Sequence, residues 1–217
     1  MSNHALKLNS ILELQRFLED KALALSDNKR LIVAISGAPG SGKSHVSQSL
    51  SNSINQVSKK SEVFSMDGFH YDDSVLKEKN LLSKKGALET FDVLGLKSFL
   101  ERLSMNTEAN VAVPVFDRDL ELSRSSALII DQSIPLIIAE GNYLLLKDKP
   151  WGDLQNYFDI TVMIKSSKEV LTERLMKRWK SYNLNLDEID QKVFHNDIPN
   201  GEFVNLNSIK PDIEIIN

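Results

Sequence analysis

Residues 31–46 read LIVAISGAPGSGKSHV, an apolar run followed by a glycine-rich loop that ends in a lysine and a serine. Gly37, Gly42, Lys43 and Ser44 satisfy the spacing G-x-x-x-x-G-K-[ST], with a strand-like run before the loop and a helical pattern after it. Glycines allow backbone N–H groups to point inward around a polyphosphate, and the helix N-terminus adds the positive end of its dipole. A Gly-Ser turn that happens to contain a lysine is the alternative, and the flanking strand and helix argue against it.

This phosphate-binding loop predicts a nucleotide site made by consecutive residues. Lys43 is a compact cation that can reach the β and γ phosphates, and the Ser44 hydroxyl can bind Mg²⁺. We therefore predict ATP and Mg²⁺ as cofactors. The residues expected to contact the nucleotide are Gly37, Ala38, Pro39, Gly40, Ser41, Gly42, Lys43, Ser44 and His45.

Length and composition are typical of one globular domain. The chain has 217 residues, of which 41% are hydrophobic and 26% are charged. The formal net charge of −4 argues against broad binding to nucleic acid or to an anionic membrane. Cysteine is absent, the apolar runs are far shorter than the roughly 20 residues of a membrane helix, and the N-terminus lacks a signal-peptide core. We therefore expect a cytoplasmic protein without disulfides.

Short apolar runs alternate with helical patterns along the chain. The runs are LIVAIS (31–36), EVFSMD (62–67), PLIIAEG (135–141), DITVMIK (159–165) and DIEII (212–216). Most are almost continuously apolar, which predicts parallel strands buried on both faces. Helical patterns over 43–55, 93–103 and 168–180 lie between them, so the class is α/β.

The remaining segments complete the predicted architecture. Apolar spacing over 8–25 predicts a helix that packs the N-terminal segment 1–27 on the body, and VAVPVFD with ALIID predicts a flanking β-hairpin. The segments 68–86 and 180–203 read as long polar loops, the second as a lid. We predict one domain, 1–217, with a three-layer P-loop NTPase fold, a mainly parallel five-stranded sheet, a small flanking β-hairpin and a helical lid.

Two acids end predicted strands, where ligands bind in open α/β sheets. Asp67 could accept the proton of an attacking hydroxyl, and a solvated turn aspartate is the alternative. We expect it on the strand next to the phosphate-binding loop, facing the outermost phosphate. Glu140 has the placement of an acid that binds Mg²⁺ directly or through water, so Ser44 and Glu140 are the predicted metal ligands.

A basic helical face precedes the predicted lid. Arg174, Lys177 and Arg178 are three and four residues apart, so their side chains are neighbours on a helix. Such a cluster could fold over ATP and neutralise charge on the transferring phosphoryl group, and a solvated face is the alternative. The four histidines show no zinc-ligand spacing, and we predict no structural metal.

With these residues in place, the chain resembles the phosphoribulokinase and uridine kinase family, which includes pantothenate kinases of the phosphate-loop type. Within that family it is most similar to bacterial proteins described as nucleoside or nucleotide kinase-like or as fructose transport system kinases. The segments that carry the resemblance are GAPGSGKS, SMDGFHYDD, KKGALETFDVLGL, VAVPVFDRDLELSR, IIAEGNYLLL, PWGDLQNYFD, ERLMKRW and HNDIPNGEFV.

The resemblance implies roles for individual residues. It implies that Asp67 is the general base and that Lys43 and Arg174 stabilise the transferring phosphoryl group, with Arg178 also at the nucleotide. The acceptor residues that it implies, or that lie in its segments, are His70, Tyr71, Asp92, Arg118, Glu121, Glu140 and Asn142. Uridine kinases have a base-contacting histidine where Glu121 aligns, and Arg118 replaces an aromatic residue. We therefore favour a sugar or another polyhydroxylated acceptor.

These observations predict a kinase that transfers the γ-phosphoryl group of ATP to a hydroxyl of a small metabolite. A uridine-type or pantothenate kinase is an alternative, and a regulatory ATPase without an acceptor is an alternative of another class. A GTPase is disfavoured because DVLG (92–95) matches D-x-x-G but no N-K-x-D motif is present. The partners expected are ATP and the acceptor, with no nucleic acid and no membrane. The resemblance also implies that the chain could form homodimers.

Overall fold

One parallel sheet forms the centre of the molecule. The computed structural model describes residues 6–7, 11–25, 29–57 and 60–217. The sheet has six strands in the order β1-β8-β7-β2-β6-β3, and every neighbouring pair is parallel. The strands are β1 (Leu6–Lys7), β2 (Leu31–Gly37), β3 (Ser61–Ser65), β6 (Leu136–Gly141), β7 (Ile160–Lys165) and β8 (Ile213–Ile216). The five predicted strands are confirmed, and the two-residue β1 adds a sixth at one edge.

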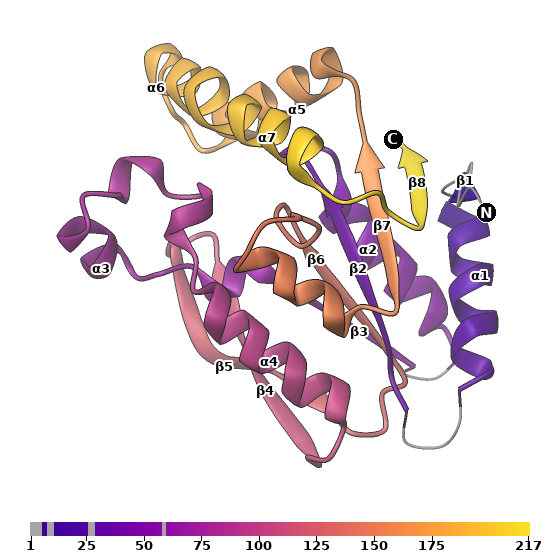
Figure 1. The fold of residues 1–217 in the computed structure, drawn as a ribbon. Helices are drawn as coiled ribbons and strands as arrows, with labels where there is room; N and C mark the ends of the chain where they lie inside the picture. The colour runs from indigo at the N-terminus through magenta and orange to yellow at the C-terminus, as the bar shows by residue number, and fades with distance from the viewer. Residues whose placement is uncertain (1–5, 8–10, 26–28, 58–59) are drawn as a thin grey trace.

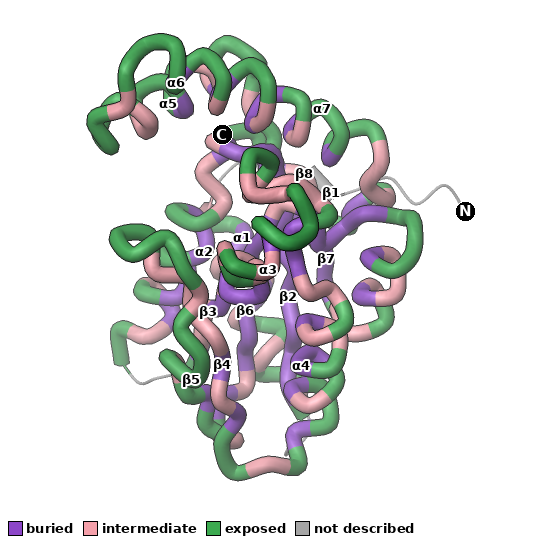
Figure 2. The backbone as a smooth tube through the Cα atoms, turned by 90° about the vertical axis from the view of Figure 1, so that its left-hand side faces the viewer, coloured by how far each residue is buried: buried purple, intermediate pink, exposed green. Residues whose placement is uncertain are grey.

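Helices cover both faces of this sheet (Figure 1). On one face α1 (Ile11–Leu23) and α2 (Lys43–Ile54) contribute Leu14, Leu18 and Leu50 to one hydrophobic cluster with the strands. On the other face α4 (Val93–Met105) and the 3-10 helix η4 (Trp151–Tyr157) pack in a second cluster. The predicted three-layer fold is therefore confirmed, and positions 8–10 of the predicted N-terminal helix lie outside the described residues. Figure 2 shows the buried strands between more exposed helices.

A two-stranded antiparallel hairpin flanks the sheet, as predicted. It consists of β4 (Asn110–Asp117) and β5 (Leu122–Asp131), and its register shifts between Val113 and Val115, around Pro114. A proline has no N–H to donate to the ladder, which explains the irregularity there. The hairpin packs on the 3-10 helix η1 (Met66–Phe69), where a Cβ on Gly68 would clash with the Pro114 carbonyl oxygen. The hairpin is therefore held close to the residues that follow β3.

The segment 180–203, predicted as a long polar loop, is mostly helical, so that prediction was wrong. After α5 (Lys168–Ser181) come α6 (Leu186–Lys192), the π-helix η5 (Val193–Asp197) and α7 (Ile198–Asn207). Asn185 and Glu188 form a capping box at the start of α6, and α7 has a proline in its first turn. In Figure 1 these helices form one layer above the carboxyl ends of the central strands. The predicted helical lid is thus present as a layer of helices, interrupted between Ser181 and Leu186.

The segment 68–86, also predicted as a loop, contains short helices. They are α3 (Asp73–Glu78) and η2 (Leu82–Lys84), and η3 (Leu88–Thr90) follows them. Figure 1 shows α3 projecting from the body.

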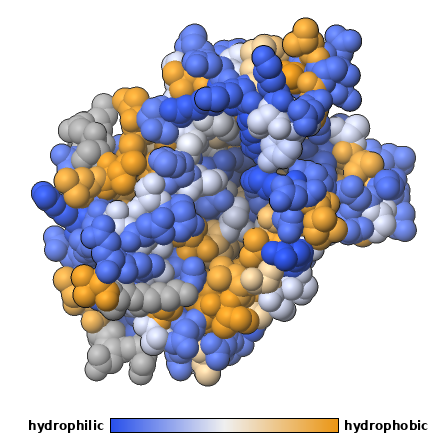
Figure 3. All heavy atoms as spheres, turned by 180° about the vertical axis from the view of Figure 1, so that it is seen from behind, coloured by the Kyte–Doolittle hydropathy of each residue, from blue (hydrophilic) through white to orange (hydrophobic). Residues whose placement is uncertain are grey.

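The face seen in Figure 3 carries its hydrophobic side chains in separate patches among hydrophilic ones. Among the described residues, none of the helices combines the length and the apolar character needed to cross a bilayer.

Candidate active site

The phosphate-binding loop connects β2 to α2 in a conformation that requires glycine. Gly40 and Gly42 have φ values of +79° and +89°, in the left-handed region. A Cβ on Gly37 would come within 2.7 Å of the Ile164 carbonyl oxygen. The Ser41 hydroxyl is buried and has no hydrogen-bond partner among the described residues. The loop therefore has the bare backbone that the sequence predicted at the start of a helix.

Lys43, Ser44 and Glu140 meet at the base of the loop. The Ser44 hydroxyl donates to Glu140 Oε2 at 3.1 Å, and Glu140 is only 5% exposed. Burial raises the pKa of the Glu140 carboxyl although Lys43 and two serine hydroxyls act in the opposite direction. Burial also lowers the pKa of Lys43, against the attraction of Glu140 and Asp67. Lys43 is thus half-buried and attracted by two carboxylates, and an added phosphate would further favour its charged form.

Asp67 lies in η1, after the end of β3, and its carboxylate is paired with an arginine. Arg118 Nη2 donates to Asp67 Oδ2 at 2.7 Å, and Nδ1 of His70 is 2.8 Å from the Asp67 carbonyl oxygen. Burial acts to raise the pKa of Asp67, but the neighbouring positive charges, Arg118 foremost, outweigh it and hold the pKa below its ordinary value. The carboxylate is therefore ionised at neutral pH.

The sheet order corrects one prediction about Asp67. We expected this residue on the strand next to β2, but β6 lies between β2 and β3. The neighbouring strand instead supplies Glu140, at the carboxyl end of β6. Glu140 is therefore hydrogen-bonded to Ser44, whereas Asp67 follows the strand one position further from β2.

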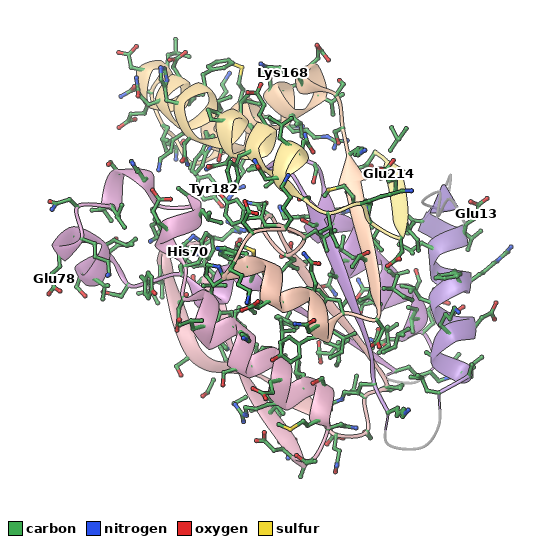
Figure 4. All side chains as sticks on the ribbon, viewed as in Figure 1. Glu13, His70, Glu78, Lys168, Tyr182 and Glu214 are labelled. Carbon is green, nitrogen blue, oxygen red and sulfur yellow. The ribbon has the colours of Figure 1, made fainter. Side chains whose placement is uncertain are left out.

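A cavity of about 320 Å³ joins the phosphate-binding loop, η1, the hairpin and the lid. Its lining is predominantly charged and polar, with a few aromatic side chains. The lining residues are Pro39, Gly40, Gly42, Lys43, Ser44, Asp67, His70, Lys85, Gly86, Phe91, Phe116, Arg118, Glu121, Asn142, Arg174, Arg178, Trp179, Lys192, Asn196 and Asp197. In Figure 4, His70 lies with the body of the molecule, below the helical layer that carries Tyr182. The phosphate-binding loop and Asp67 therefore open into one space.

The lid contributes the upper wall of this cavity. Arg174 Nη1 lies 3.3 Å from the carbonyl oxygen of Ser41, which joins α5 to the phosphate-binding loop. Trp179 Nε1 donates to Asp197 Oδ2 at 2.6 Å, and burial raises the pKa of this 8% exposed carboxyl. Ala38 packs with lid residues in a third hydrophobic cluster. Of the basic face predicted on this helix, Arg174 and Arg178 line the cavity, whereas Lys177 does not.

Several predicted site residues lie elsewhere. His45 is exposed on α2, and Tyr71 is half-buried outside the lining, with Lys79 Nζ at 5.9 Å from its ring centre. Asp92 is also outside the lining, and its Oδ1 accepts a hydrogen bond from Gly95 N at 2.9 Å as the N-cap of α4. This geometry gives Asp92 a structural role at the start of α4. His70, Arg118, Glu121 and Asn142 do line the cavity.

Sequence reasoning missed residues that the fold brings to the cavity. Lys85, Asn196 and Asp197 belong to segments that carry the family resemblance, but nothing in their spacing marked them. Lys85 Nζ pairs with Asp73 at 2.7 Å, and its side chain is only 13% exposed. Phe116 packs near His70, with ring centres 4.9 Å apart. The alternation of side chains along β4 places Phe116 on one face of the strand, but the sequence does not show which residues pack against that face.

Comparison with known proteins gives this geometry a family context. The model of the phosphoribulokinase / uridine kinase family matches residues 32–197. The Escherichia coli protein YggC, described as uncharacterized, is 32% identical over 186 residues, covering 85% of this chain and 76% of YggC. The pantothenate kinase of Ligilactobacillus salivarius is 26% identical, and the match covers 69% of this chain but 49% of that enzyme.

Solved structures agree with this match. The crystal structure titled "putative fructose transport system kinase" from Silicibacter sp. TM1040 is 32% identical, with a TM-score of 0.85, and the alignment covers 94% of this chain and 98% of that one. The D-glycerate 3-kinase of Cryptococcus neoformans has a TM-score of 0.70 at 13% identity, which shows a shared fold alone. The alignments with the E. coli and Silicibacter relatives each cover most of this chain.

Proposed function

The chain belongs to the phosphoribulokinase / uridine kinase family of small-molecule kinases, and we propose that it transfers the γ-phosphoryl group of ATP to a hydroxyl of a sugar or related polyhydroxylated compound. The observation that carries this proposal is that Lys43 and Asp67 line the same cavity. A cation for phosphate and a carboxylate for a hydroxyl are the two groups that the transfer needs, and the cavity offers room between them for an acceptor.

In this proposal each residue has a separate role in the transfer of the phosphoryl group. The acceptor hydroxyl oxygen attacks the γ-phosphorus, and its proton passes to the Asp67 carboxylate. The bond from the γ-phosphorus to the bridging oxygen breaks, and that oxygen leaves with ADP. Lys43, with Arg174 and Arg178 from α5, neutralises charge on the phosphoryl group as it moves. The products are ADP and a phosphate monoester.

The residues at the base of the loop fit a magnesium ion. Ser44 presents a hydroxyl and Glu140 a carboxylate, and these oxygens are 3.1 Å apart. Hard oxygen donors of this kind suit Mg²⁺, which keeps several of its own waters in nucleotide sites. We propose that Ser44 holds the ion directly and that Glu140 orients its waters. When bound, Mg²⁺ neutralises charge on the β and γ phosphates.

The acceptor end of the cavity supports a hydroxylated molecule. Asp67, Glu121 and Asn142 offer oxygen acceptors to hydroxyl groups, and Asn142 Oδ1 has no hydrogen-bond partner among the described residues. Arg118 and Lys85 add donors near the Phe116 ring, and Lys85 also donates to Asp73 and to the Glu121 carbonyl oxygen. Together these groups can bind several hydroxyls at once, as a sugar requires.

A nucleoside is the second candidate acceptor. His70 packs against Phe91 and Phe116, with ring centres 3.9 Å and 4.9 Å apart, and all three residues line the cavity. Such an aromatic wall can stack on a flat base. One relative from Schizosaccharomyces pombe, 28% identical over 197 residues, carries the name of a uridine kinase.

A screen for acceptor-dependent ADP formation tests the proposal. The purified protein is incubated with Mg²⁺ and ATP, and with panels of sugars, sugar acids, sugar phosphates, nucleosides and pantothenate. We expect at least one hydroxylated compound to raise ADP formation well above the rate in its absence, with a phosphorylated product detected by mass spectrometry. A regulatory ATPase would instead release ADP slowly and at the same rate with every compound. Lys43→Met is the control that separates this activity from a contaminating kinase.

A further inference from the structure

The carboxylate proposed as the base is paired with an arginine of the hairpin. Arg118, in the turn between β4 and β5, donates from Nη2 to Asp67 Oδ2 at 2.7 Å. The side chains of Arg118 and Asp67 are 41% and 21% exposed, so the pair lies at the open cavity and not in the core. An ion pair with this exposure adds little to the stability of the fold. Its position on the reacting carboxylate therefore suggests a role in the reaction.

The remaining contacts of Arg118 leave it able to bind a second anion. Its guanidinium lies over the Phe116 ring, 5.9 Å from the ring centre, and Lys85 Nζ lies 5.3 Å from the same ring centre. In the part of the chain that the structure describes, Asp67 is its one hydrogen-bond partner, and that bond uses one nitrogen of the fork. A guanidinium can bind a carboxylate or a phosphate through two parallel N–H groups. Arg118 and Lys85 thus lie beside one aromatic ring at the acceptor end of the cavity, and Lys85 is itself paired with Asp73 and Glu121.

We infer that Arg118 determines acceptor specificity by holding Asp67 until an acceptor that carries an anionic group binds the guanidinium. This inference rests on the proposed function. Asp67 accepts a single bond from Nη2, whereas an anionic group can take Nη2 as one of two parallel charge-assisted bonds, so it competes with Asp67 for Arg118; a neutral hydroxyl cannot. Binding of such an acceptor therefore frees Asp67 Oδ2 at the moment when a substrate hydroxyl is in place. The acceptor class is a hydroxylated carboxylate or phosphate.

The same contact limits the competing reaction with water. In that reaction a water oxygen attacks the γ-phosphorus, its proton passes through Asp67 to solvent, and the bond to the bridging oxygen breaks to give ADP and inorganic phosphate. Arg118 occupies one oxygen of Asp67 and lowers the basicity of the carboxylate. In this inference the contact persists when ATP binds. Water is small and neutral and has no means to displace Arg118. ATP is thereby retained until the proper acceptor arrives.

The hairpin supplies a matched control for this role. Arg124, on β5, pairs with Asp117 at 3.2 Å, and neither residue lines the cavity. Both arginines lie in the same hairpin and both pair with an aspartate, but one of these aspartates is the proposed base. A difference between Arg118→Met and Arg124→Met therefore reports on the pairing with Asp67 and not on the hairpin itself.

The experiment measures ATP hydrolysis without acceptor in the wild type, Arg118→Met, Arg124→Met and Arg118→Met/Asp67→Asn. We expect Arg118→Met to raise hydrolysis about tenfold, a modest part of what a general base contributes, and Arg124→Met to leave it unchanged. The double variant returns to the wild-type rate or below, because the gain passes through Asp67. Binding of a fluorescent ATP analogue confirms that every variant is folded.

Acceptor pairs that differ by one anionic group form the second arm. They are hexoses against their 6-phosphates and against their aldonic acids, and nucleosides against their 5′-monophosphates. The wild type should phosphorylate the anionic member of each pair faster than the neutral one. Comparison of the phosphate and carboxylate series shows which anion Arg118 binds. Arg118→Met should lose most of the preference for the anionic member. Unchanged hydrolysis in Arg118→Met, a gain that survives Asp67→Asn, or a best acceptor that is neutral would each overturn the inference. The proposed function fails separately, if Asp67→Asn alone keeps full activity with the best acceptor.

Discussion

The nucleotide end and the acceptor end of the cavity are built in different ways. The nucleotide end comes from one continuous segment, β2, the glycine loop and the start of α2, and Gly40, Gly42 and Lys43 take their places from local backbone geometry. The acceptor end comes from η1, the segment before α4, the hairpin and the lid. Its residues meet only because the sheet, the hairpin and the helical layer pack together. Binding of phosphate is therefore a local property, whereas choice of acceptor depends on tertiary structure.

This difference explains how one fold can serve several acceptors. The phosphate-binding loop has close backbone contacts, such as Gly37 against the Ile164 carbonyl, that leave little room for change. The acceptor end is lined by side chains such as Lys85, Arg118 and Glu121, which lie in turns. Substitutions at the two ends should therefore differ in size and in kind.

The largest effect is expected at the nucleotide end, from Lys43→Met. Removing the cation that faces the phosphates should lower kcat/KM about a thousandfold, because this charge acts on the phosphoryl group in a poorly hydrated site. Lys177→Met is the matched control, since Lys177 is an exposed lysine of α5 outside the cavity lining. Steady-state kinetics of ADP formation check the prediction. Equal losses in the two variants would show that Lys43 has no special place at the phosphates.

A smaller effect is expected at the acceptor end, from Lys85→Gln. Loss of this ammonium should raise KM for the acceptor about tenfold while KM for ATP stays within twofold, because one charge-assisted hydrogen bond accounts for roughly 1.5–3 kcal/mol. Lys84 is the matched control, because it is adjacent in sequence but 63% exposed and pairs with Glu89 at 3.7 Å. If Lys84→Gln and Lys85→Gln behaved alike, the acceptor end would not be organised by burial as described here.

The smallest effect concerns stability and comes from the lid. Because burial raises the pKa of Asp197 in the folded state, the folded protein binds this proton more tightly than the unfolded chain does. Asp197 therefore lowers stability as pH rises through its ordinary range, and that cost is absent in acid. Asp197→Asn, which keeps an oxygen acceptor for Trp179, should raise Tm by a few degrees at pH 8 and have no effect near pH 3. Thermal unfolding of the ligand-free protein at both pH values provides the measurement, and a gain that is the same at both would contradict the burial argument.

Local patterns in the sequence predicted the boundaries of the strand and the helix at the nucleotide end to within one residue. The strand expected at 31–36 is observed over Leu31–Gly37, and the helix expected at 43–55 is observed over Lys43–Ile54. Both predictions depend on the spacing of hydrophobic residues and of glycines, and this spacing can be seen in a short stretch of sequence. The positions of Asp67 and Glu140 at strand ends were also predicted, although the strand order that separates them was not.

The lid and the acceptor end could not be predicted in the same way. Asparagine, aspartate, proline and glycine in HNDIPNG are typical of loops, but this segment is helical because Val193 and Ile198 are buried against Ala38 and α5. Asp92 fits an acceptor role by resemblance, yet its side chain caps α4 because Gly95 lies three residues ahead. Lys84 and Lys85 are adjacent residues of the same type, so the sequence alone does not show which of the two side chains is buried. Their different exposure comes from tertiary packing.

The central claim is that the two ends act together through Asp67, which serves the acceptor and not the nucleotide. The most direct measurement compares Asp67→Asn with the wild type, both for binding of Mg²⁺ and ATP by calorimetry and for phosphorylation of the best acceptor from the screen. We predict that Kd for ATP stays within about threefold while kcat with the acceptor falls about a hundredfold or more. Unchanged kcat, or a loss of ATP binding that accounts for the loss of activity, would contradict the account.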